Sequence, residues 1–196
     1  RSGAEGRDAD VKFGLHALGI GAGAERPVIQ AVASAAEEHG FATLWSGEHV
    51  VMVDESASRY PYADDGRIAV PAVADWIDPM IGLSFVAAAT STIGIATGVL
   101  LLPEHNPVIV AKQAASLDRL SGGRVVLGVG VGSLAEEFDL LGAVFDGRGE
   151  RADDAIRALR ASLSTTRPEY QGPYFRFGGV AVEPCAVQPR VPIWVG

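Results

Sequence analysis

A histidine that can titrate near neutral pH follows an acidic residue in the segment SGEHV. The apolar and aromatic residues just before this segment favour a strand, so Ser46, Glu48 and His49 are expected at its carboxyl end. That edge of a parallel barrel is where catalytic side chains lie, and His49 could donate or accept a proton there, with Ser46 or Glu48 nearby. The alternative is a loop histidine that caps a helix or binds a backbone carbonyl.

Glycines occupy the expected carboxyl ends of two further strands. Gly98 lies in the run ATGV, and Gly128, Gly130 and Gly132 form the run GVGVG. Glycine lets a flat ligand approach the backbone, which favours a binding site. The alternative is that these glycines only relieve crowding inside a barrel or fit a bulge. The run matches neither a P-loop nor the dinucleotide-binding spacing, so by itself it is a weak signal.

Two adjacent carboxylates, Glu136 and Glu137, follow the last of these glycines. Paired carboxylates can serve acid/base or metal chemistry, but neighbouring helical residues point about 100° apart and rarely share one ligand. We therefore expect a solvated helix start here. The single cysteine, Cys185, excludes an internal disulfide and gives no metal cluster. No metal site is expected.

The elements that must position these residues alternate between strands and helices. Strands are predicted at 11–15, 41–45, 93–102, 125–131 and 192–195, and helices at 27–39, 79–88, 107–120 and 153–163. Asp78-Pro79 and Asn106-Pro107 are helix-start signals, because the first residue can cap free backbone N–H groups and proline tolerates the first helical position. The strand at 93–102 is apolar on both faces, which is typical of a parallel strand in an α/β fold.

Helical periodicity also predicts which side chains face inward and which pair on the surface. Inward positions are expected at Val28, Val32 and Ala35; Ile81, Phe85 and Ala88; Val110, Ala114, Leu117 and Leu120; and Ile156, Leu159 and Leu163. Asp153 and Arg157 are expected to form a helical ion pair.

Two connections are unusual. Residues 51–76 lack periodicity, and their aromatic side chains favour a lid or binding loop over a floppy insertion. Residues 169–187 resemble a small hairpin, which either reaches the mouth of the site or simply covers the barrel end.

Composition narrows the class of protein. The formal charge is −8 and 48% of the residues are hydrophobic, as in a soluble, acidic, globular protein. No Lys/Arg run indicates nucleic acid or an anionic membrane as a partner, and no apolar stretch reaches the length of a transmembrane helix. We expect a cytoplasmic protein. Residues 1–10 are polar and do not begin with Met, so a disordered terminus or an expression remnant is expected before a domain at 11–196.

The block TGVLLLPEHNPVIVAKQAASLDRLSGGRVVLGVGVG, the following EEFDLLG and the late PIWVG resemble the bacterial luciferase-like oxidoreductases, which use flavin or the deazaflavin coenzyme F420. The resemblance runs from about Val11 to Gly196. It implies a (β/α)8 TIM barrel of the luciferase-like type, of which this chain covers about the first five strands. Because five of eight strands leave open edges, we expect a piece of a longer protein whose cofactor-phosphate site lies beyond Gly196.

The same resemblance implies an oxidoreductase that uses coenzyme F420 for hydride transfer to or from a small organic substrate, since an acidic residue followed by His resembles the F420-dependent branch. One alternative is an FMN-dependent monooxygenase that uses oxygen, with a flavin or F420 reductase as partner. Another is a cofactor-free binding paralogue. Relatives commonly dimerise through early helices, so a homodimer is expected.

The resemblance also assigns site residues. His49 is implied as the catalytic acid/base or ring-polarising group, and His16 and Trp76 are expected in the substrate pocket. A cis peptide bond is implied between Gly98 and Val99. Sugar-phosphate dehydrogenases of the F420 branch carry an aromatic residue and a Glu where this chain has Val53 and Ser133, so a sugar phosphate is not expected as substrate. The expected cofactor-binding residues are Ser46, Glu48, Gly98, Val99, Gly130, Gly132 and Ser133.

Overall fold

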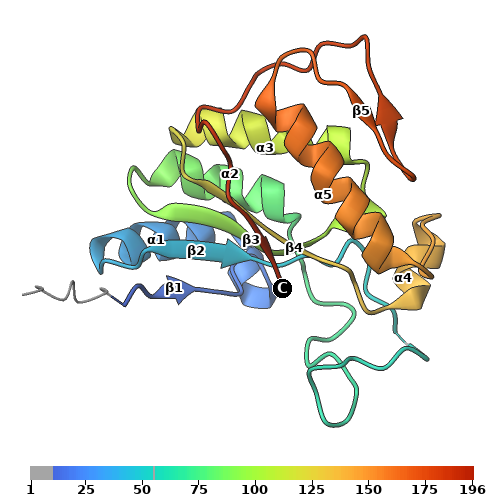
Figure 1. Cartoon of the computed structure of the whole chain (residues 1–196). Coiled ribbons are helices and arrows are strands. Elements are labelled where there is room, and N and C mark those ends of the chain that lie inside the picture. The colour runs from blue at the N-terminus through green and yellow to red at the C-terminus, as the bar shows by residue number, and fades with distance from the viewer. Residues whose placement is uncertain (1–10, 55) are drawn as a thin grey trace, which may run out of the picture.

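A computed structural model describes residues 11–54 and 56–196, and its centre is a five-stranded parallel sheet in the order β1-β2-β3-β4-β7 (Figure 1). The predicted residues 1–10 lie outside the described part of the chain. A separate antiparallel pair is formed by β5 and β6. The strands are β1 (Gly14–Leu15), β2 (Thr43–Ser46), β3 (Gly94–Leu101), β4 (Val125–Gly130), β5 (Tyr170–Gln171), β6 (Arg176–Phe177) and β7 (Ile193–Val195).

Helices connect the parallel strands and pack on one another in succession, α1 on α2, α2 on α3 and α3 on α5 (Figure 1). The α-helices are α1 (Arg26–Glu38), α2 (Pro79–Ala89), α3 (Pro107–Ser121), α4 (Ala135–Leu140) and α5 (Arg148–Ser164), with 3-10 turns η1 (Gly21–Ala24) and η2 (Leu102–Glu104). This alternation confirms the predicted parallel α/β architecture of a partial barrel. No helix in the described ranges is long and apolar enough to cross a membrane.

The predicted helix starts are confirmed at the atomic level. The Asp78 carboxylate accepts a hydrogen bond from the Ile81 N–H at 2.9 Å, and the Asn106 side chain accepts one from the Val108 N–H at 2.9 Å. Helix α3 ends where Gly122 adopts the left-handed conformation, with φ 71°. Local capping chemistry therefore determines where these helices begin and end.

Several predicted inward positions are wrong. In α1 the buried residues are Ile29, Ala33 and Ala36 instead of Val28 and Ala35, which are exposed, and the predicted Val32 is only partly buried. In α2, Ile81 and Phe85 are 60% and 40% exposed and Ala88 is also exposed, while Leu83, Val86 and Ala87 are buried. This helix is apolar nearly all round, so periodicity cannot distinguish its faces and packing against neighbouring elements selects one.

Two further details correct the sequence-based prediction. Leu120, near the end of α3, is 77% exposed, because it lies on the outer face of the helix, while Asp118 and Ser121 in the same turn are buried. The carboxylate that pairs with Arg157 is Asp154, at 3.6 Å, and not Asp153. Asp154 also accepts a hydrogen bond from the Tyr174 N–H, so the chain beyond α5 turns back onto this side of the helix.

The partly buried Arg124 connects several of these elements through hydrogen bonds. The Arg124 guanidinium donates to the carbonyls of Ala87, Thr90, Ile93 and Ser121 and thereby joins the end of α2 to the start of β3 and the end of α3. Burial lowers the pKa of Arg124 from its ordinary value. The guanidinium supplies several fixed donors at once, which an ammonium group cannot do.

Candidate active site

A cleft of about 330 Å³ lies at the carboxyl ends of the parallel strands. It brings together every predicted site residue except Ser46. A neighbouring cavity of about 580 Å³ is formed mainly by the connection 51–76 and shares Tyr60 with the cleft, but none of the histidines lines it. The cleft is lined by His16, Ile20, Gly47, Glu48, His49, Tyr60, Pro61, Tyr62, Trp76, Gly98, Val99, Leu101, Gly130, Val131, Gly132, Ser133, Arg148 and Gly196.

Ser46 does not face the cleft. Its side chain is buried, and its hydroxyl donates to the Leu18 carbonyl at 3.0 Å. Because side chains alternate along a strand, the residue that ends β2 points into the protein while the loop after it reaches the cleft. Ser46 therefore joins the β1 and β2 ends and does not line the cleft.

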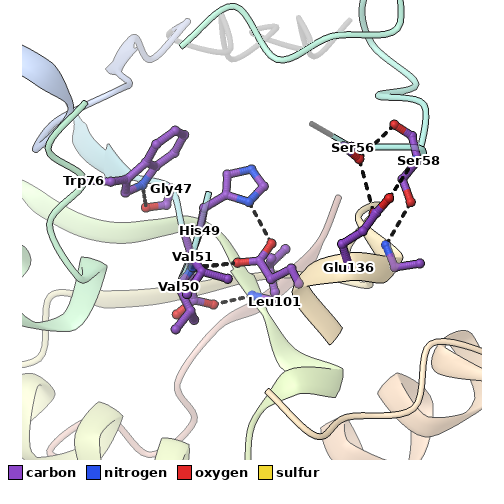
Figure 2. Close-up of polar contacts among 12 residues, drawn as sticks. Gly47, His49, Val50, Val51, Ser56, Ser58, Trp76, Leu101 and Glu136 are labelled. Atoms are coloured by element: carbon purple, nitrogen blue, oxygen red, sulfur yellow. Dashed lines mark hydrogen bonds and ion pairs between the residues drawn. The ribbon is translucent and has the colours of Figure 1, made fainter. Parts of the chain in front are cut away.

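His49 is paired with a carboxylate from a distant part of the chain. Its Nδ1 lies 2.9 Å from Oε2 of Glu137, whose side chain is 1% exposed. The other carboxylate oxygen, Oε1, accepts hydrogen bonds from the N–H groups of Val50 and Val51 at 2.7 and 3.2 Å (Figure 2). The carboxylate thus holds both the imidazole and the backbone that follows it.

Trp76 forms the second contact with the histidine. The two rings meet edge to face, with centroids 4.9 Å apart and an interplanar angle of 87°. The indole Nε1 donates to the Gly47 carbonyl at 3.0 Å (Figure 2). Because this bond fixes the indole, Trp76 limits the rotation of the His49 ring.

The paired glutamates lie in the first turn of α4, so the predicted helix start is confirmed, but the expected solvation is wrong for Glu137, which is buried. Glu136, the neighbour of the buried Glu137, accepts hydrogen bonds from the N–H groups of Ala57 and Ser58 and from the hydroxyl of Ser56. Hydrogen bonds from Ser58 and from backbone N–H groups lower the pKa of Glu136 to about 2. The two carboxylates bind different partners, as their angular separation predicts, and both hold the connection after β2.

Glu48 is also engaged, although not by His49. Its carboxylate accepts a hydrogen bond from the Leu101 N–H at 2.7 Å and contacts Nε2 of His105 at 3.0 Å. Burial disfavours the charged His105 ring, but the hydrogen bond and the charge of Glu48 outweigh it and raise the pKa of His105. Glu48 therefore lines the cleft while its charge is directed to the end of β3.

The carboxyl group of Glu104 has no hydrogen-bond donor near it in the described structure. Both of its oxygens are buried and have no hydrogen-bond partner in the described part of the protein. Burial, together with the charges of Glu137 and Glu48, raises the pKa of Glu104 to about 8. Glu104, His105 and Glu137 were not predicted as site residues, although the first two follow directly on the apolar strand at 93–102, where the carboxyl edge was expected.

The backbone at the ends of β3 and β4 forms one wall of the cleft, here called the glycine wall: Gly98, Gly130 and Gly132. The implied cis peptide bond between Gly98 and Val99 is present, and the β3–β4 register shifts beside it. The Gly98 carbonyl accepts a hydrogen bond from Nε2 of His16 at 2.6 Å. A Cβ at Gly98 would lie 3.1 Å from that nitrogen, so only glycine leaves this surface flat.

The sequence profile of the luciferase-like monooxygenases matches residues 14–196. The chain belongs to this family. The resemblance predicted from the sequence blocks is thereby confirmed, and the parallel sheet with its connecting helices is the first part of the luciferase-like barrel.

Curated relatives of this luciferase-like chain are longer than it is. An uncharacterised protein of Mycobacterium tuberculosis is 34% identical over 166 residues, which are 85% of this chain and 59% of the relative. The 4-hydroxyprotoasukamycin monooxygenase of Streptomyces nodosus subsp. asukaensis is 34% identical over 132 residues, 67% of this chain and 30% of that enzyme. The chain thus spans less than two thirds of the length of these relatives.

Solved structures show the same fold. The monooxygenase RslO1 from Streptomyces bottropensis has a TM-score of 0.74 at 26% identity, with 94% of this chain and 53% of that chain covered. The coenzyme F420 dependent tetrahydromethanopterin reductase from Methanopyrus kandleri has a TM-score of 0.72 at 23% identity, with 96% and 50% covered. The oxygenating constituent of 3,6-diketocamphane monooxygenase of Pseudomonas putida, in complex with FMN, has a TM-score of 0.69 at 17% identity, with 94% and 51% covered.

The cleft of this luciferase-like chain fits a flat ring system. Its volume lies within the range of small-molecule sites, and the glycine wall presents backbone without side chains to one side of a planar ligand. His49 and Trp76, on the loop after β2 and its continuation, line the same cleft as the glycine wall. In the described ranges no group of three His, Cys, Asp or Glu side chains is placed to hold a metal ion.

Proposed function

We propose that the protein is a luciferase-like oxidoreductase that binds coenzyme F420 in the cleft and transfers hydride to or from a small organic substrate. The observation that carries the proposal is the arrangement of the glycine wall beside His49, a titratable ring whose side chain is 12% exposed. A flat cofactor could lie against the backbone there with one face open to the imidazole. The acidic residue before His49 favours F420 over FMN, by resemblance to the F420-dependent branch.

The cofactor, when bound, supplies the electrons, and the residues of this chain supply position and protons. Gly98, Gly130 and Gly132 would take the ring against the backbone. His49 would hold or release a proton at Nε2, the ring nitrogen that has no hydrogen bond in the described part of the protein. Trp76 keeps the imidazole in place from the other side.

The connection 51–76 would form the substrate side of the site. It is anchored at Val50 and Val51 by Glu137 and at Ala57 and Ser58 by Glu136. Its residues 60–62 line the cleft, which supports the proposal that it acts as a lid. Enclosure by such a loop keeps water from a reacting centre. Because Val53 and Ser133 stand where sugar-phosphate dehydrogenases of the F420 branch carry an aromatic residue and a Glu, we propose a substrate other than a sugar phosphate.

A second candidate function is an FMN-dependent monooxygenase, which would require a reductase as partner. The naming of a 34% identical relative as a monooxygenase favours this alternative. The glycine wall would accept either ring. We further propose a homodimer in which the exposed Ile81 and Phe85 of α2 become buried, since exposed large apolar side chains on one helix face are typical of interfaces.

A His49→Ala variant of the full-length protein tests the proposal. If His49 transfers a proton, kcat with reduced or oxidised F420 should fall by roughly 10²–10⁴-fold, while the Kd for F420 changes only a few-fold. A variant at the exposed His39, His39→Ala, serves as control and should retain turnover. Wild-type turnover in His49→Ala would remove His49 from the mechanism.

A further inference from the structure

We propose that Glu137 is the positioning residue that holds His49 with its proton on Nδ1, so that Nε2 remains free to accept a proton in the cleft. This inference rests on the proposed function, because it assigns a partner to the group that acts there. It concerns a residue that the sequence placed on a solvated helix.

The hydrogen-bond partners of Glu137 determine which nitrogen of His49 carries the proton. Oε1 accepts two backbone hydrogen bonds, from Val50 and Val51, and Oε2 faces Nδ1 of His49 at 2.9 Å. An ionised carboxylate can only accept, so Nδ1 must donate. A neutral imidazole has a single N–H, and its other nitrogen, Nε2, then carries the free lone pair.

The neighbouring carboxyl group supports the ionised state of Glu137. Glu104 lies close enough to feel the charge of Glu137, yet it has no donor of its own in the described structure. When two carboxyl groups share a buried region, the one without donors retains its proton and the one with donors ionises. Glu137 accepts from two backbone N–H groups whatever the tautomer of His49, so the negative charge belongs there.

The fold holds Glu137 rigidly. The next residue, Phe138, is fully buried and packs edge to face on Phe145, with centroids 5.2 Å apart. Glu137 and His49 are 88 positions apart in sequence, so the contact exists only because α4 lies beside the loop that follows β2. The Glu137 carboxylate is anchored in the core and also binds the backbone that follows His49. Such a partner can fix both the rotation and the tautomer of an imidazole ring, as carboxylates do for metal-bound histidines.

The substitution Glu137→Gln reverses the tautomer without removing the side chain. The amide oxygen can still accept from Val50 and Val51, but the amide N–H group then faces Nδ1 of His49 and requires an acceptor there. The proton should therefore move to Nε2, and the acceptor in the cleft is lost. The neighbouring substitution Glu136→Gln is the matched control, because Glu136 holds the same connection and does not touch His49.

The experiment is a ¹⁵N NMR measurement on full-length protein with labelled histidines, with the His49 signals assigned through His49→Gln. The wild type and Glu136→Gln should both have protonated Nδ1 and unprotonated Nε2. Glu137→Gln should show the opposite assignment, together with a kcat at least tenfold lower and a KM within about threefold, since a positioning residue acts on the chemical step.

Two results would overturn the inference. One is a wild type whose His49 carries its proton on Nε2, a measurement that does not use Glu137→Gln and so remains decisive if that variant fails to fold. The other is a Glu137→Gln protein with the wild-type tautomer. If the tautomer shifts as expected but wild-type protein binds neither F420 nor FMN, the proposed function fails while the positioning of His49 by Glu137 stands.

Discussion

Glu104 and Glu137 are neighbouring buried carboxyl groups with opposite surroundings. Oε1 of Glu137 accepts two backbone hydrogen bonds and Oε2 faces Nδ1 of His49 at 2.9 Å, whereas the oxygens of Glu104 have no hydrogen-bond partner in the described structure. The charge of Glu137 contributes to raising the pKa of Glu104 to about 8. One proton is therefore held beside the cleft at neutral pH, on the carboxyl group that lacks donors.

This arrangement predicts how stability depends on pH. Below pH 4.5 Glu104 is protonated in both folded and unfolded protein, whereas between pH 4.5 and about 8 only the unfolded state releases the proton. The wild type should therefore lose stability across that window relative to Glu104→Gln. After allowance for partial solvent screening, the difference should grow from near zero to roughly 1–3 kcal/mol at pH 8.

Urea unfolding of both proteins at pH 5, 6.5 and 8 measures this difference, with the exposed Glu38→Gln as control. Parallel stability curves for the wild type and Glu104→Gln would contradict the assignment of a raised pKa. The raised pKa of His105 also makes stability fall as pH rises, because the stabilisation from its charged form is lost when the ring releases its proton. This effect should be the same in the wild type and in Glu104→Gln, so it does not change the difference between them.

Arg124→Lys should destabilise the protein strongly. One ammonium group cannot reach the carbonyls of Ala87, Ile93 and Ser121 together, so buried acceptors lose their donors. We expect a loss of about 2–4 kcal/mol in the free energy of unfolding. Arg119→Lys, at an exposed position of the same helix end, should change it by less than about 0.5 kcal/mol.

Replacing a residue of the glycine wall should weaken binding of the cofactor. A Cβ at Gly130 would lie 2.6 Å from Cγ2 of Val99, so Gly130→Ala pushes the Val99 side chain toward the cleft or distorts the strand. Cofactor affinity should fall about tenfold or more, with a loss of stability of roughly 1–3 kcal/mol. At Gly149, where a Cβ meets open space in α5, the substitution to Ala should leave affinity unchanged and retain or slightly raise stability. Equal affinities of the two variants would show that Gly130 is not needed for ligand binding.

Sequence reasoning located the edge of the site because the relevant signals are local. The strand before SGEHV, the glycines in and just after β3 and β4, and the capped starts of α2 and α3 each depend on a few adjacent residues. The structure contains all of them. The resemblance added the cis bond between Gly98 and Val99, which no local pattern indicates.

The interior of the site could not be predicted because it depends on long-range contacts. The Glu137–His49 pair joins residues 88 positions apart, and the hydrogen bonds of Glu136 depend on the path of the irregular connection 51–76. Adjacent carboxylates on an amphipathic helix start ordinarily face solvent, so their composition gave the wrong environment. The inward face of α2 was wrong for a related reason, since an apolar sequence leaves the choice of face to packing.

Binding of a deazaflavin or flavin ring in the cleft can be tested directly by titration. Full-length protein would be titrated with coenzyme F420 and separately with FMN, with fluorescence quenching as readout, alongside Gly130→Ala. We predict that the wild type binds F420 tightly and that Gly130→Ala binds it more weakly. A preference for FMN would support the monooxygenase alternative. A folded wild-type protein that binds neither would contradict the account and favour a cofactor-free binding protein.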